Sequence, residues 1–307
     1  MSILVVGSIA LDTVKTPFGM AKDVLGGSAT YFSVSASFFE PDVNLVAIVG
    51  DDFPAKYVNL LEGKGIDLKG MVTGKGKTFR WEGEYGWDFS NPRTIATRLN
   101  VLSRFNPAIP REYRNSEYVF LANIDPQIQK QVLNQMARPK LVACDTMNYW
   151  IENKRKDLVK LLKKVDIFLL NEAEAKELAG ESSLVKAAKA ILKFGPKRII
   201  IKKGEHGSLL FSGNSVFSTP AYLMESIFDP TGAGDTFAGG LVGYLAACKT
   251  QNQAGLADRQ ANLRKAIVYG SVMATFAVED FSLRRLASIT RADIVRRFKQ
   301  FRKLTHF

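Results

Sequence analysis

Short apolar runs alternate with helix-like segments through the middle of the chain, and this alternation limits the fold more than any other feature. Four runs have the length and the β-branched content of buried strands, and segments with helical periodicity separate them. The strand-like runs are residues 118–122, 141–145, 167–170 and 198–202, and the helix-like segments are residues 127–136, 151–163, 172–178 and 184–194. Repeated units of this kind predict an α/β fold with a mostly parallel central sheet and helices on both faces.

The N-terminal part of the chain continues this pattern. Residues 3–6 and 43–49 are apolar runs that end at Gly7 and Gly50, and helix-like segments at 29–39 and 57–64 follow them. Ligands of parallel sheets bind at the carboxyl ends of the strands. One cleft could therefore collect the residues that follow strand-like runs, which are Asp12, Asn123, Asp145, Asn171 and Gly204.

Residues from about 72 to 104 break the pattern. This segment lacks helical periodicity and is rich in aromatic residues, charges and glycines. Short, partly exposed antiparallel strands fit it, either as a plain surface hairpin stack or as a β-rich lid that also includes part of 12–20. Such an insertion is also a candidate homodimer surface. Because no linker or internal repeat divides the chain, we predict that residues 1–307 form a single domain with this insertion.

The composition excludes several classes of protein. The formal net charge of +12 suggests nucleic acid, but the basic excess lies in helical surface patterns, which favours solvated helix faces. No apolar run approaches the roughly 20 residues of a membrane span, and the first residues do not resemble a signal peptide, so we expect a cytoplasmic protein without a membrane partner. Two cysteines and two histidines argue against a disulfide framework, a histidine zinc site and a Ser-His-Asp triad.

A glycine-rich turn with two carboxylates occupies residues 229–240 and leads into an apolar stretch. Gly232 and Gly234 permit positive φ and leave room for a ligand, and the N–H groups of a following helix favour anions. A carboxylate in such a turn would repel phosphate, so Asp235 is interpreted as the base that takes a proton from a hydroxyl during phosphoryl transfer. The alternative is an ordinary helix start with Thr231 or Asp235 as its cap.

Residues 229–240 resemble the C-terminal signature of the ribokinase family, the PfkB-type carbohydrate and nucleoside kinases. Other family-like segments follow in the expected order, at 7–12, 26–27, 50–52, 171–174 and 203–207. The resemblance implies a three-layer αβα ribokinase-like fold with a small β lid. It also implies that Asp235 is the catalytic base and that the amides of Gly232, Ala233 and Gly234 form an anion hole.

The resemblance further implies ATP and Mg²⁺ as cofactors. Asn171 and Glu174 match the family's Asn-x-x-Glu motif, whose glutamate acts on magnesium and its waters, although the same pair also fits a helix capping box. Residues 203–207 resemble the nucleotide-binding turn, although a simple β-turn fits them as well. The residues assigned to the nucleotide on this basis are Asn171, Lys203, Gly204, Gly207, Thr231 and Asn262.

The acceptor side agrees with the family only in part. Asp12 resembles the carboxylate that binds substrate hydroxyls, and the paired glycines would let the backbone approach a sugar. Ribokinase-like members have asparagines where this chain has Ala10 and Tyr31. The loss of those hydrogen bonds argues against strict ribokinase activity and favours a nucleoside or a differently shaped sugar. The predicted acceptor-binding residues are Asp12, Gly26, Gly27, Tyr31 and Asn123.

Together these observations predict an ATP- and magnesium-dependent kinase that phosphorylates a hydroxymethyl group of a small sugar or nucleoside. A dedicated nucleoside kinase is one alternative. A phosphofructokinase-type acceptor is another, and it would require a basic residue near the acceptor, for which Arg93, Arg98 and Arg104 are candidates. A third is a kinase-fold binding protein without turnover, against which the presence of Asp235 and the loop glycines argues.

Overall fold

A nine-stranded sheet lies at the centre of the protein and is parallel except at one edge. The computed structural model describes residues 1–89, 92–248 and 256–305. In spatial order the strands are β13 (Ser215–Thr219), β12 (Ser208–Ser212), β11 (Arg198–Lys202), β10 (Ile167–Asn171), β9 (Leu141–Cys144), β8 (Tyr118–Leu121), β1 (Ile3–Val6), β4 (Val43–Gly50) and β5 (Ile66–Gly74). Only the pairs β11–β12 and β12–β13 among these described strands are antiparallel.

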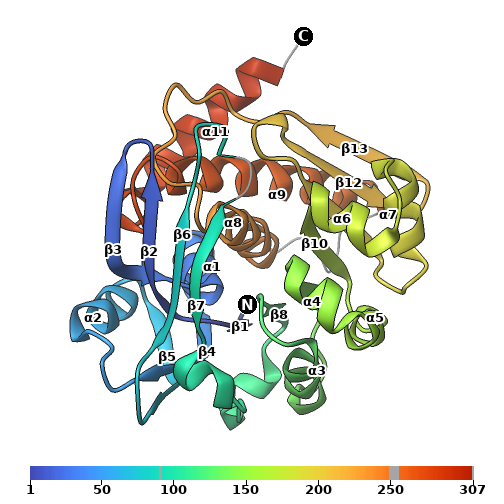
Figure 1. Ribbon diagram of the computed structural model, residues 1–307. Helices are drawn as coiled ribbons and strands as arrows, with labels where there is room; N and C mark the ends of the chain where they lie inside the picture. The colour runs from blue at the N-terminus through green and yellow to red at the C-terminus, as the bar shows by residue number, and fades with distance from the viewer. Residues whose placement is uncertain (90–91, 249–255, 306–307) are drawn as a thin grey trace.

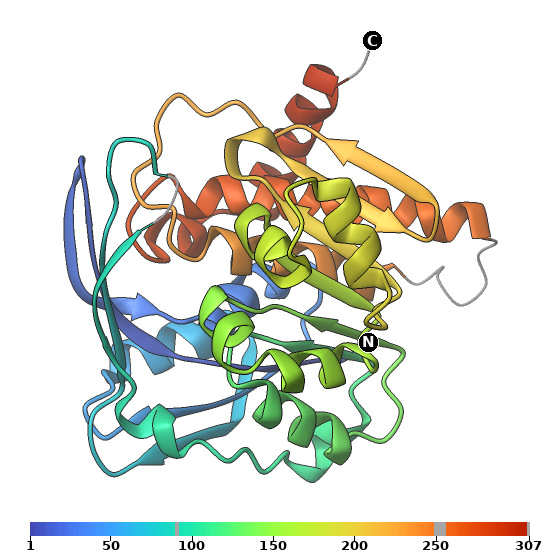
Figure 2. The same cartoon turned by 45° about the vertical axis from the view of Figure 1, so that its right-hand side comes forward.

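Helices cover both faces of the sheet (Figure 1, Figure 2). One face carries α3 (Pro126–Gln135), α4 (Asn148–Asn153), α5 (Arg155–Leu162), α6 (Glu172–Ala179) and α7 (Leu184–Leu192). The other carries α1 (Ser28–Ser37), α2 (Ala55–Gly63), α8 (Ala233–Ala247), α9 (Leu256–Ala277), α10 (Arg284–Ser288) and α11 (Arg291–Thr305). The predicted three-layer αβα fold is therefore confirmed.

Successive residues of the central strands face opposite helical layers. In β1, Ile3 and Val5 belong to the core on the side of α1 and α8, whereas Leu4 and Val6 belong to the core on the side of α3 to α7. All four are fully buried, as expected for a parallel sheet covered on both faces. Because β1 lies between β4 and β8, the strand order reverses at β1, and ligands of such sheets bind beside this reversal.

A second, four-stranded sheet stands beside the central one, on the left in Figure 1. Its strands, in order, are β3 (Gly19–Gly26), β2 (Ala10–Thr16), β6 (Phe79–Glu84) and β7 (Arg93–Arg98), and we call it the small sheet. The segment 72–104 contributes β6 and β7, but its first residues end β5 and its last residues form the 3₁₀ helix η1 (Asn100–Arg104). Residues 90 and 91 of that segment lie outside the described part of the chain.

The two strands of the segment 72–104, β6 and β7, are antiparallel as expected, but β6 runs parallel to its other neighbour, β2. A short turn makes neighbouring strands antiparallel, but the chain between β2 and β6 passes through β3, α1, β4, α2 and β5. The pairs β2–β3 and β6–β7 are antiparallel, and β2 and β3 together reach from Ala10 to Gly26, beyond the expected 12–20.

The helix expected over residues 151–163 is in fact two helices. Lys154 interrupts it with φ −132° and ψ 24°, between α4 and α5. No glycine or proline marks this break in the sequence, so periodicity alone could not show it. The Trp150 indole N–H donates to Asn123 Oδ1 at 2.8 Å, and this bond to the end of β8 helps to set the direction of α4 separately from that of α5.

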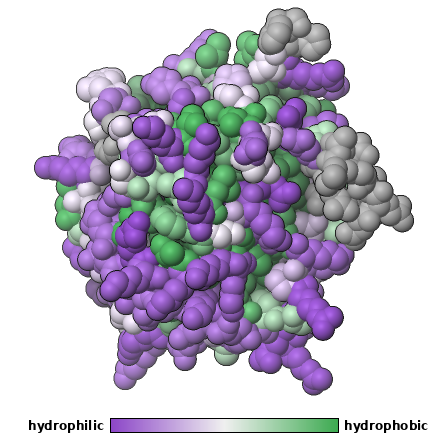
Figure 3. Space-filling model, turned by 90° about the vertical axis from the view of Figure 1, so that its right-hand side faces the viewer, coloured by the Kyte–Doolittle hydropathy of each residue, from purple (hydrophilic) through white to green (hydrophobic). Residues whose placement is uncertain are grey.

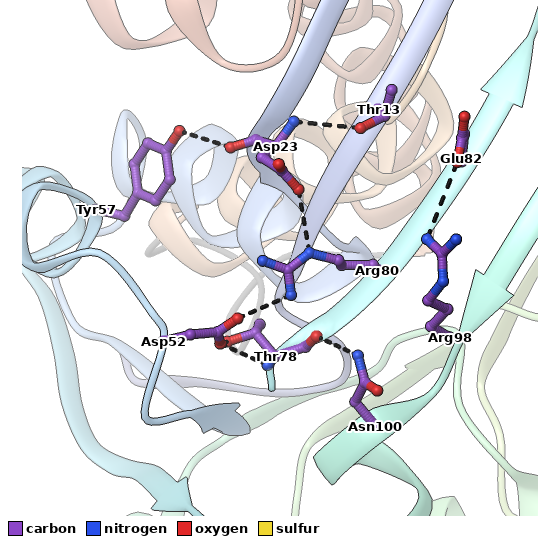
Figure 4. A network of polar contacts seen from close by, with 9 residues as sticks. All are labelled: Thr13, Asp23, Asp52, Tyr57, Thr78, Arg80, Glu82, Arg98 and Asn100. Carbon is purple, nitrogen blue, oxygen red and sulfur yellow. Dashed lines mark hydrogen bonds and ion pairs between the residues drawn. The ribbon is translucent and has the colours of Figure 1, made fainter. Parts of the chain in front are cut away.

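An ion-pair network joins the small sheet to the loop after β4 (Figure 4). Arg80, on β6, donates through Nη1 to Asp52 Oδ2 at 2.8 Å and through Nε to Asp23 Oδ1 at 3.1 Å. Asp52 Oδ1 accepts from both N and Oγ1 of Thr78, each at 2.7 Å. Burial favours the neutral form of Asp52, but the bonds from Thr78 and Arg80 outweigh it and lower the pKa of this carboxyl. The network fixes the position of β6 relative to the loop after β4.

The described helices include none that is long and apolar enough to cross a membrane. Hydrophilic side chains cover most of the face shown in Figure 3, with apolar residues visible between them. Cys144 is buried and Cys248 is half-buried, and both are free thiols.

Candidate active site

Polar side chains mark the carboxyl ends of four neighbouring strands. Asn123 and Asp145 come just after β8 and β9, Asn171 ends β10, and Lys202 ends β11 in register with Asn171. The N-terminus of α8 meets this edge, because a Cβ added to Gly234 would lie 2.8 Å from Lys202 Nζ. The fold thus gathers residues from distant parts of the sequence at the first turn of one helix.

The loop before α8 is held by Asp229, which is almost fully buried. Its Oδ1 accepts from Thr231 N at 2.9 Å, and its Oδ2 accepts from Ser282 N at 3.1 Å. Gly232 is the N-cap of α8 with φ +75°, and it offers no side chain to the helix. The alternative in which Thr231 or Asp235 caps the helix is therefore wrong. No cap side chain competes for the first-turn amides, which suits an anion.

The ring of Tyr31 packs against the loop before α8. Its side chain is 2% exposed, and a Cβ added to Gly232 would lie 2.4 Å from three atoms of its ring. Glycine is therefore required at 232 for two reasons, the close approach of the ring and the positive φ. Burial raises the pKa of Tyr31 well above its ordinary value. The ring therefore packs against the loop before α8. A contact of Tyr31 with the acceptor stays a prediction.

Three carboxylates and one ammonium group form a charged cluster at the start of α8. Lys202 Nζ donates to Asp145 Oδ2 at 3.0 Å. Burial and the charge of Asp145 raise the pKa of Asp235 to about 7, while Lys202 opposes the shift. The same two causes raise the pKa of Glu174 to about 7. Burial disfavours the charge of Lys202, but Asp145, Glu174 and Asp235 outweigh it and raise the pKa of this ammonium group.

Asp12, on β2 of the small sheet, is coupled to this cluster. Burial, followed by the charges of Asp229 and Asp235, raises its pKa to about 8. Its Oδ1 is buried without a hydrogen-bond partner among the described residues. A Cβ added to Gly26 would lie 1.9 Å from Asp12 Oδ2, and one added to Gly27 would lie 2.5 Å from Ser8 O. The two glycines thus make room for this carboxylate and for the backbone beside it.

The residues assigned to the nucleotide occupy the ends of two strands, the loop before α8, where Thr231 lies, and one more distant helix. Glu174 N donates to Asn171 Oδ1 at 2.9 Å and Asn171 N to Glu174 Oε2 at 2.7 Å, a complete capping box at the start of α6. Lys203 N donates to Gly207 O at 2.8 Å, which closes the turn that contains the exposed Gly204. Asn262 lies half-buried on α9, on the side of β13, where the nearby Gln260 donates to Ser215.

Oxygen ligands suited to magnesium are present at this edge. The described residues contain no group of three or more His, Cys, Asp or Glu side chains that could hold a metal. Magnesium needs only one or two carboxylates, because waters and substrate phosphates complete its shell. Glu174 and Asp145 repel each other strongly enough to raise the pKa of Glu174, and a cation would relieve this repulsion. The donor set therefore fits Mg²⁺.

The small sheet reaches the loop before α8 at two points. Tyr85 follows β6, and its hydroxyl lies 3.4 Å from Thr231 Oγ1. Phe18, in the turn between β2 and β3, packs its ring 5.3 Å from that of Phe228, measured between centroids. Both contacts connect the small sheet directly to the segment that leads into Asp229.

The family model described as pfkB family carbohydrate kinase matches residues 18–289, which include the loop, the capping box and the charged cluster. The chain belongs to this family. The protein is therefore a pfkB kinase, and the ribokinase resemblance of its sequence is confirmed.

Relatives of known function agree with this assignment. The pfkB kinase is 30% identical to a cytidine kinase of Thermococcus kodakarensis over 80% of this chain and 88% of the relative. It is 25% identical to a nucleoside kinase of Methanothermobacter thermautotrophicus over 84% of this chain and 80% of the relative. Its fold is similar to that of an E. coli protein assigned as ribokinase II and solved with ATP and Mg²⁺, with a TM-score of 0.76, 18% identity and coverage of 97% and 99% of the two chains.

Sequence reasoning did not single out Lys202, Tyr85 or Ser282. A lysine at the last position of a buried strand, directly before a glycine turn, was the available signal for Lys202, since that position is at the ligand-binding edge. No sequence signal could identify the other two. Tyr85 contacts a residue 146 positions away, and Ser282 contacts one 53 positions away, so only the folded chain brings them to the loop.

Proposed function

We propose that this pfkB kinase transfers the γ-phosphoryl group of ATP to a hydroxymethyl group of a nucleoside. The observation that carries the proposal is the position of Asp235, a half-buried carboxylate in the first turn of α8 whose helix has no side-chain cap. Its pKa of about 7 suits a general base that acts near neutral pH. The cytidine and nucleoside kinases among its relatives support the nucleoside as acceptor class.

The transfer joins the acceptor oxygen to the γ-phosphorus. Asp235 takes the hydroxyl proton, the new O–P bond forms, and the bond from the γ-phosphorus to the bridging oxygen breaks as ADP leaves. The amides of Gly232, Ala233 and Gly234 would donate to the oxygens that gain charge in the transition state. The positive end of the α8 dipole acts on the same oxygens.

ATP would lie over the ends of β10 and β11, where Asn171, Lys203 and Gly204 are located. Glu174 would hold Mg²⁺, directly or through water, with Asp145 nearby. The ion supplies neutralising charge to the phosphates when it is bound. The capping box fixes the Glu174 side chain, since its Oε2 accepts from Asn171 N.

Asp12 would bind the acceptor's hydroxyl groups. Its unpartnered Oδ1 is a buried polar atom that needs a hydrogen bond, and a ribose hydroxyl can provide one. The methyl group of Ala10 and the buried ring of Tyr31 stand where ribokinase-like members have amides. A free sugar, which depends on many polar contacts, would therefore bind less well than a nucleoside.

A phosphorylated sugar is a poorer acceptor for this site. The three arginines considered for that role are engaged elsewhere: Arg93 pairs with Glu84 at 2.8 Å, and Arg104 donates to Lys75 O at 2.9 Å. Arg98 lies 4.0 Å from Glu82, and its side chain is 59% exposed on the small sheet.

We also infer that the small sheet is a lid over the acceptor. The small sheet supplies Asp12 to the site, and Tyr85, which follows β6, contacts Thr231 in the loop before α8. Closure of such a sheet would exclude water from the phosphoryl group, which limits the hydrolysis of ATP.

The test is ADP release from ATP and Mg²⁺ with a panel of cytidine, uridine, adenosine, inosine, ribose and fructose 6-phosphate. We expect turnover with at least one nucleoside, little with the two sugars, and none above background for Asp235→Asn. The matched control is Asp67→Asn, which removes a carboxylate at the opposite end of the sheet, on β5. Preference for fructose 6-phosphate, or equal rates for Asp235→Asn and wild type, would contradict the proposal.

A further inference from the structure

Lys202 lies in an electrostatically unusual position. The N-terminus of a helix carries partial positive charge and ordinarily attracts anions, not cations. Lys202 Nζ nevertheless lies over the first turn of α8, 2.8 Å from where a Gly234 Cβ would be, and its side chain is only 17% exposed. Two positive groups this close to each other are stable only when negative charge lies near both.

Part of that negative charge comes from the protein itself. Asp145 accepts a hydrogen bond from Lys202 Nζ at 3.0 Å, and Glu174 and Asp235 act on it through their charges. An ammonium group has three N–H donors. Among the described residues, the bond to Asp145 is the one hydrogen bond that Nζ makes. The other two donors are available to a ligand that binds beside Gly234.

We propose that Lys202 contacts the transferred phosphoryl group, with the phosphoryl oxygens held between its ammonium group and the first-turn amides of α8. The inference rests on the proposed function and adds a catalytic residue to it. Asp145 holds the ammonium group in place before the nucleotide binds. As charge builds on the equatorial oxygens in the transition state, Lys202 neutralises it from the side opposite the helix. No bond to Lys202 is made or broken.

The chemistry of a lysine suits this role. Its ammonium group is a compact charge on a flexible stem, so it can move with the phosphoryl group from donor to acceptor while Asp145 keeps it in the site. An arginine could pair with two phosphate oxygens but would have to fit a larger planar group beside Gly234. A shorter or neutral side chain would leave the phosphoryl oxygens without this partner.

The test compares Lys202→Met, Lys202→Arg and the matched control Lys197→Met. Lys197 precedes the opposite end of β11, where its exposed side chain pairs with Asp166 at 2.6 Å. We expect kcat to fall about 10²–10³-fold in Lys202→Met, with the acceptor KM changed less than about threefold. Lys202→Arg should recover part of kcat, and Lys197→Met should match wild type. A kcat for Lys202→Met within about fivefold of wild type would overturn the inference.

A second measurement separates phosphate contact from a purely structural role. We expect Lys202→Met to weaken binding of a non-hydrolysable ATP analogue at least tenfold and to leave AMP binding unchanged, since AMP lacks the phosphate that Lys202 contacts. If Lys202 only neutralises Asp145, the double variant Lys202→Met/Asp145→Asn should have the same kcat as Asp145→Asn alone, and this result would overturn the inference. A kcat of the double variant well below that of Asp145→Asn supports it.

These outcomes also distinguish failure of the inference from failure of the proposed function. If wild type releases ADP with a nucleoside but Lys202→Met is equally active, only the role of Lys202 is wrong. If wild type neither binds the ATP analogue nor releases ADP with any nucleoside, the proposed function itself is wrong, and the inference fails with it.

Discussion

The carboxyl edge of the central sheet and the small sheet both carry many charges, but in opposite environments. At the edge, the side chains of the Asp145–Lys202 pair are 6% and 17% exposed. In the small sheet, Glu84 pairs with Lys15 and Arg93, whose side chains are 62% and 75% exposed. Water and salt weaken interactions between exposed charges, whereas buried charges interact strongly and shift each other's pKa.

Because of this difference, we assign the chemical step to the edge of the central sheet and acceptor binding to the small sheet. The edge holds Lys202 on β11, Glu174 on α6 and Asp235 on α8, so its charge is available for chemistry. The small sheet contributes one buried carboxylate, Asp12, and its Glu84 ion pairs face water. We therefore expect substitutions at the edge to act on kcat, and substitutions in the small sheet to act mainly on the KM of the acceptor.

The largest expected effect is that of Asp235→Asn. Loss of the base should lower kcat by about 10²–10⁴-fold with little change in KM. The same change should raise the melting temperature of the ligand-free protein by a few degrees at pH 8.5, because it removes a buried charge that Asp145 repels. Thermal unfolding of both proteins at pH 5 and 8.5 checks this, and a variant less stable than wild type at pH 8.5 would argue against a repulsive cluster.

The pH dependence of kcat/KM should show the titration of the charged cluster. Asp235 accepts a proton only when ionised, so kcat/KM should fall about tenfold per pH unit below an apparent pKa near 7. In Lys202→Met this apparent pKa should rise, because Lys202 favours the ionised form. A profile that is flat from pH 5.5 to 8 would contradict the assignment of Asp235 as the base.

The free energy of unfolding should decrease as pH rises, because burial raises the pKa of Asp12. Asp12 has a pKa raised to about 8 in the folded protein, against about 4 when unfolded. Between these values the native state keeps a proton that the unfolded state has released. The contribution of Asp12 to the free energy of unfolding should therefore be fully present below about pH 4 and should decrease as pH rises to about 8. Asp12→Asn should reduce this slope in denaturant titrations, and an unchanged slope would exclude Asp12 as its source.

Asp12→Asn should also test the acceptor site. The amide keeps the shape of the carboxyl but replaces one acceptor oxygen with an NH2 donor, so we expect the nucleoside KM to rise about 10-fold to 100-fold and the ATP KM to stay within about twofold. Initial rates over a matrix of both substrates check this. Equal changes in the two KM values would place Asp12 outside the acceptor pocket.

The smallest effects should come from a pair of adjacent residues. Tyr85 is buried and touches Thr231, whereas Glu84 faces water in an exposed ion pair. Tyr85→Phe should raise the acceptor KM a few-fold, and Glu84→Gln should change neither KM nor stability measurably, since exposed pairs contribute about 0–1 kcal/mol. If Glu84→Gln has the larger effect, the exposed ion pairs of the small sheet contribute to acceptor binding or to stability, contrary to this prediction.

The central fold could be predicted because its signals are local. Continuous apolar runs, such as β1 and β10, reveal a parallel sheet that is covered on both faces, and the glycine-rich turn before Asp235 identifies the family. The small sheet was harder to predict, because its β2–β6 pair joins segments separated by several elements of the central domain. Its strands β3, β6 and β7 are partly exposed, so their apolar pattern is weak, and part of β2 and β3 was left out of the expected lid.

In the candidate site, the sequence predicted which residues gather at the strand ends, but not which side chains from distant segments touch each other. Asn171 and Glu174, three residues apart, could be paired from sequence. The contact of Lys202 with Asp145 could not, because it depends on the order of β9, β10 and β11 in the sheet. The packing of the Tyr31 ring against Gly232 was not predicted either, because it joins α1 to the distant loop before α8.

The most direct test of the central claim is a crystal structure with a non-hydrolysable ATP analogue, Mg²⁺ and the nucleoside that the enzyme turns over. The account predicts the acceptor hydroxymethyl oxygen about 2.6–3.2 Å from a carboxylate oxygen of Asp235. It also predicts the γ-phosphate over the amides of Gly232 to Gly234, in contact with Lys202 Nζ. A nucleotide bound with its γ-phosphate away from the start of α8, or a hydroxymethyl group directed away from Asp235, would contradict it.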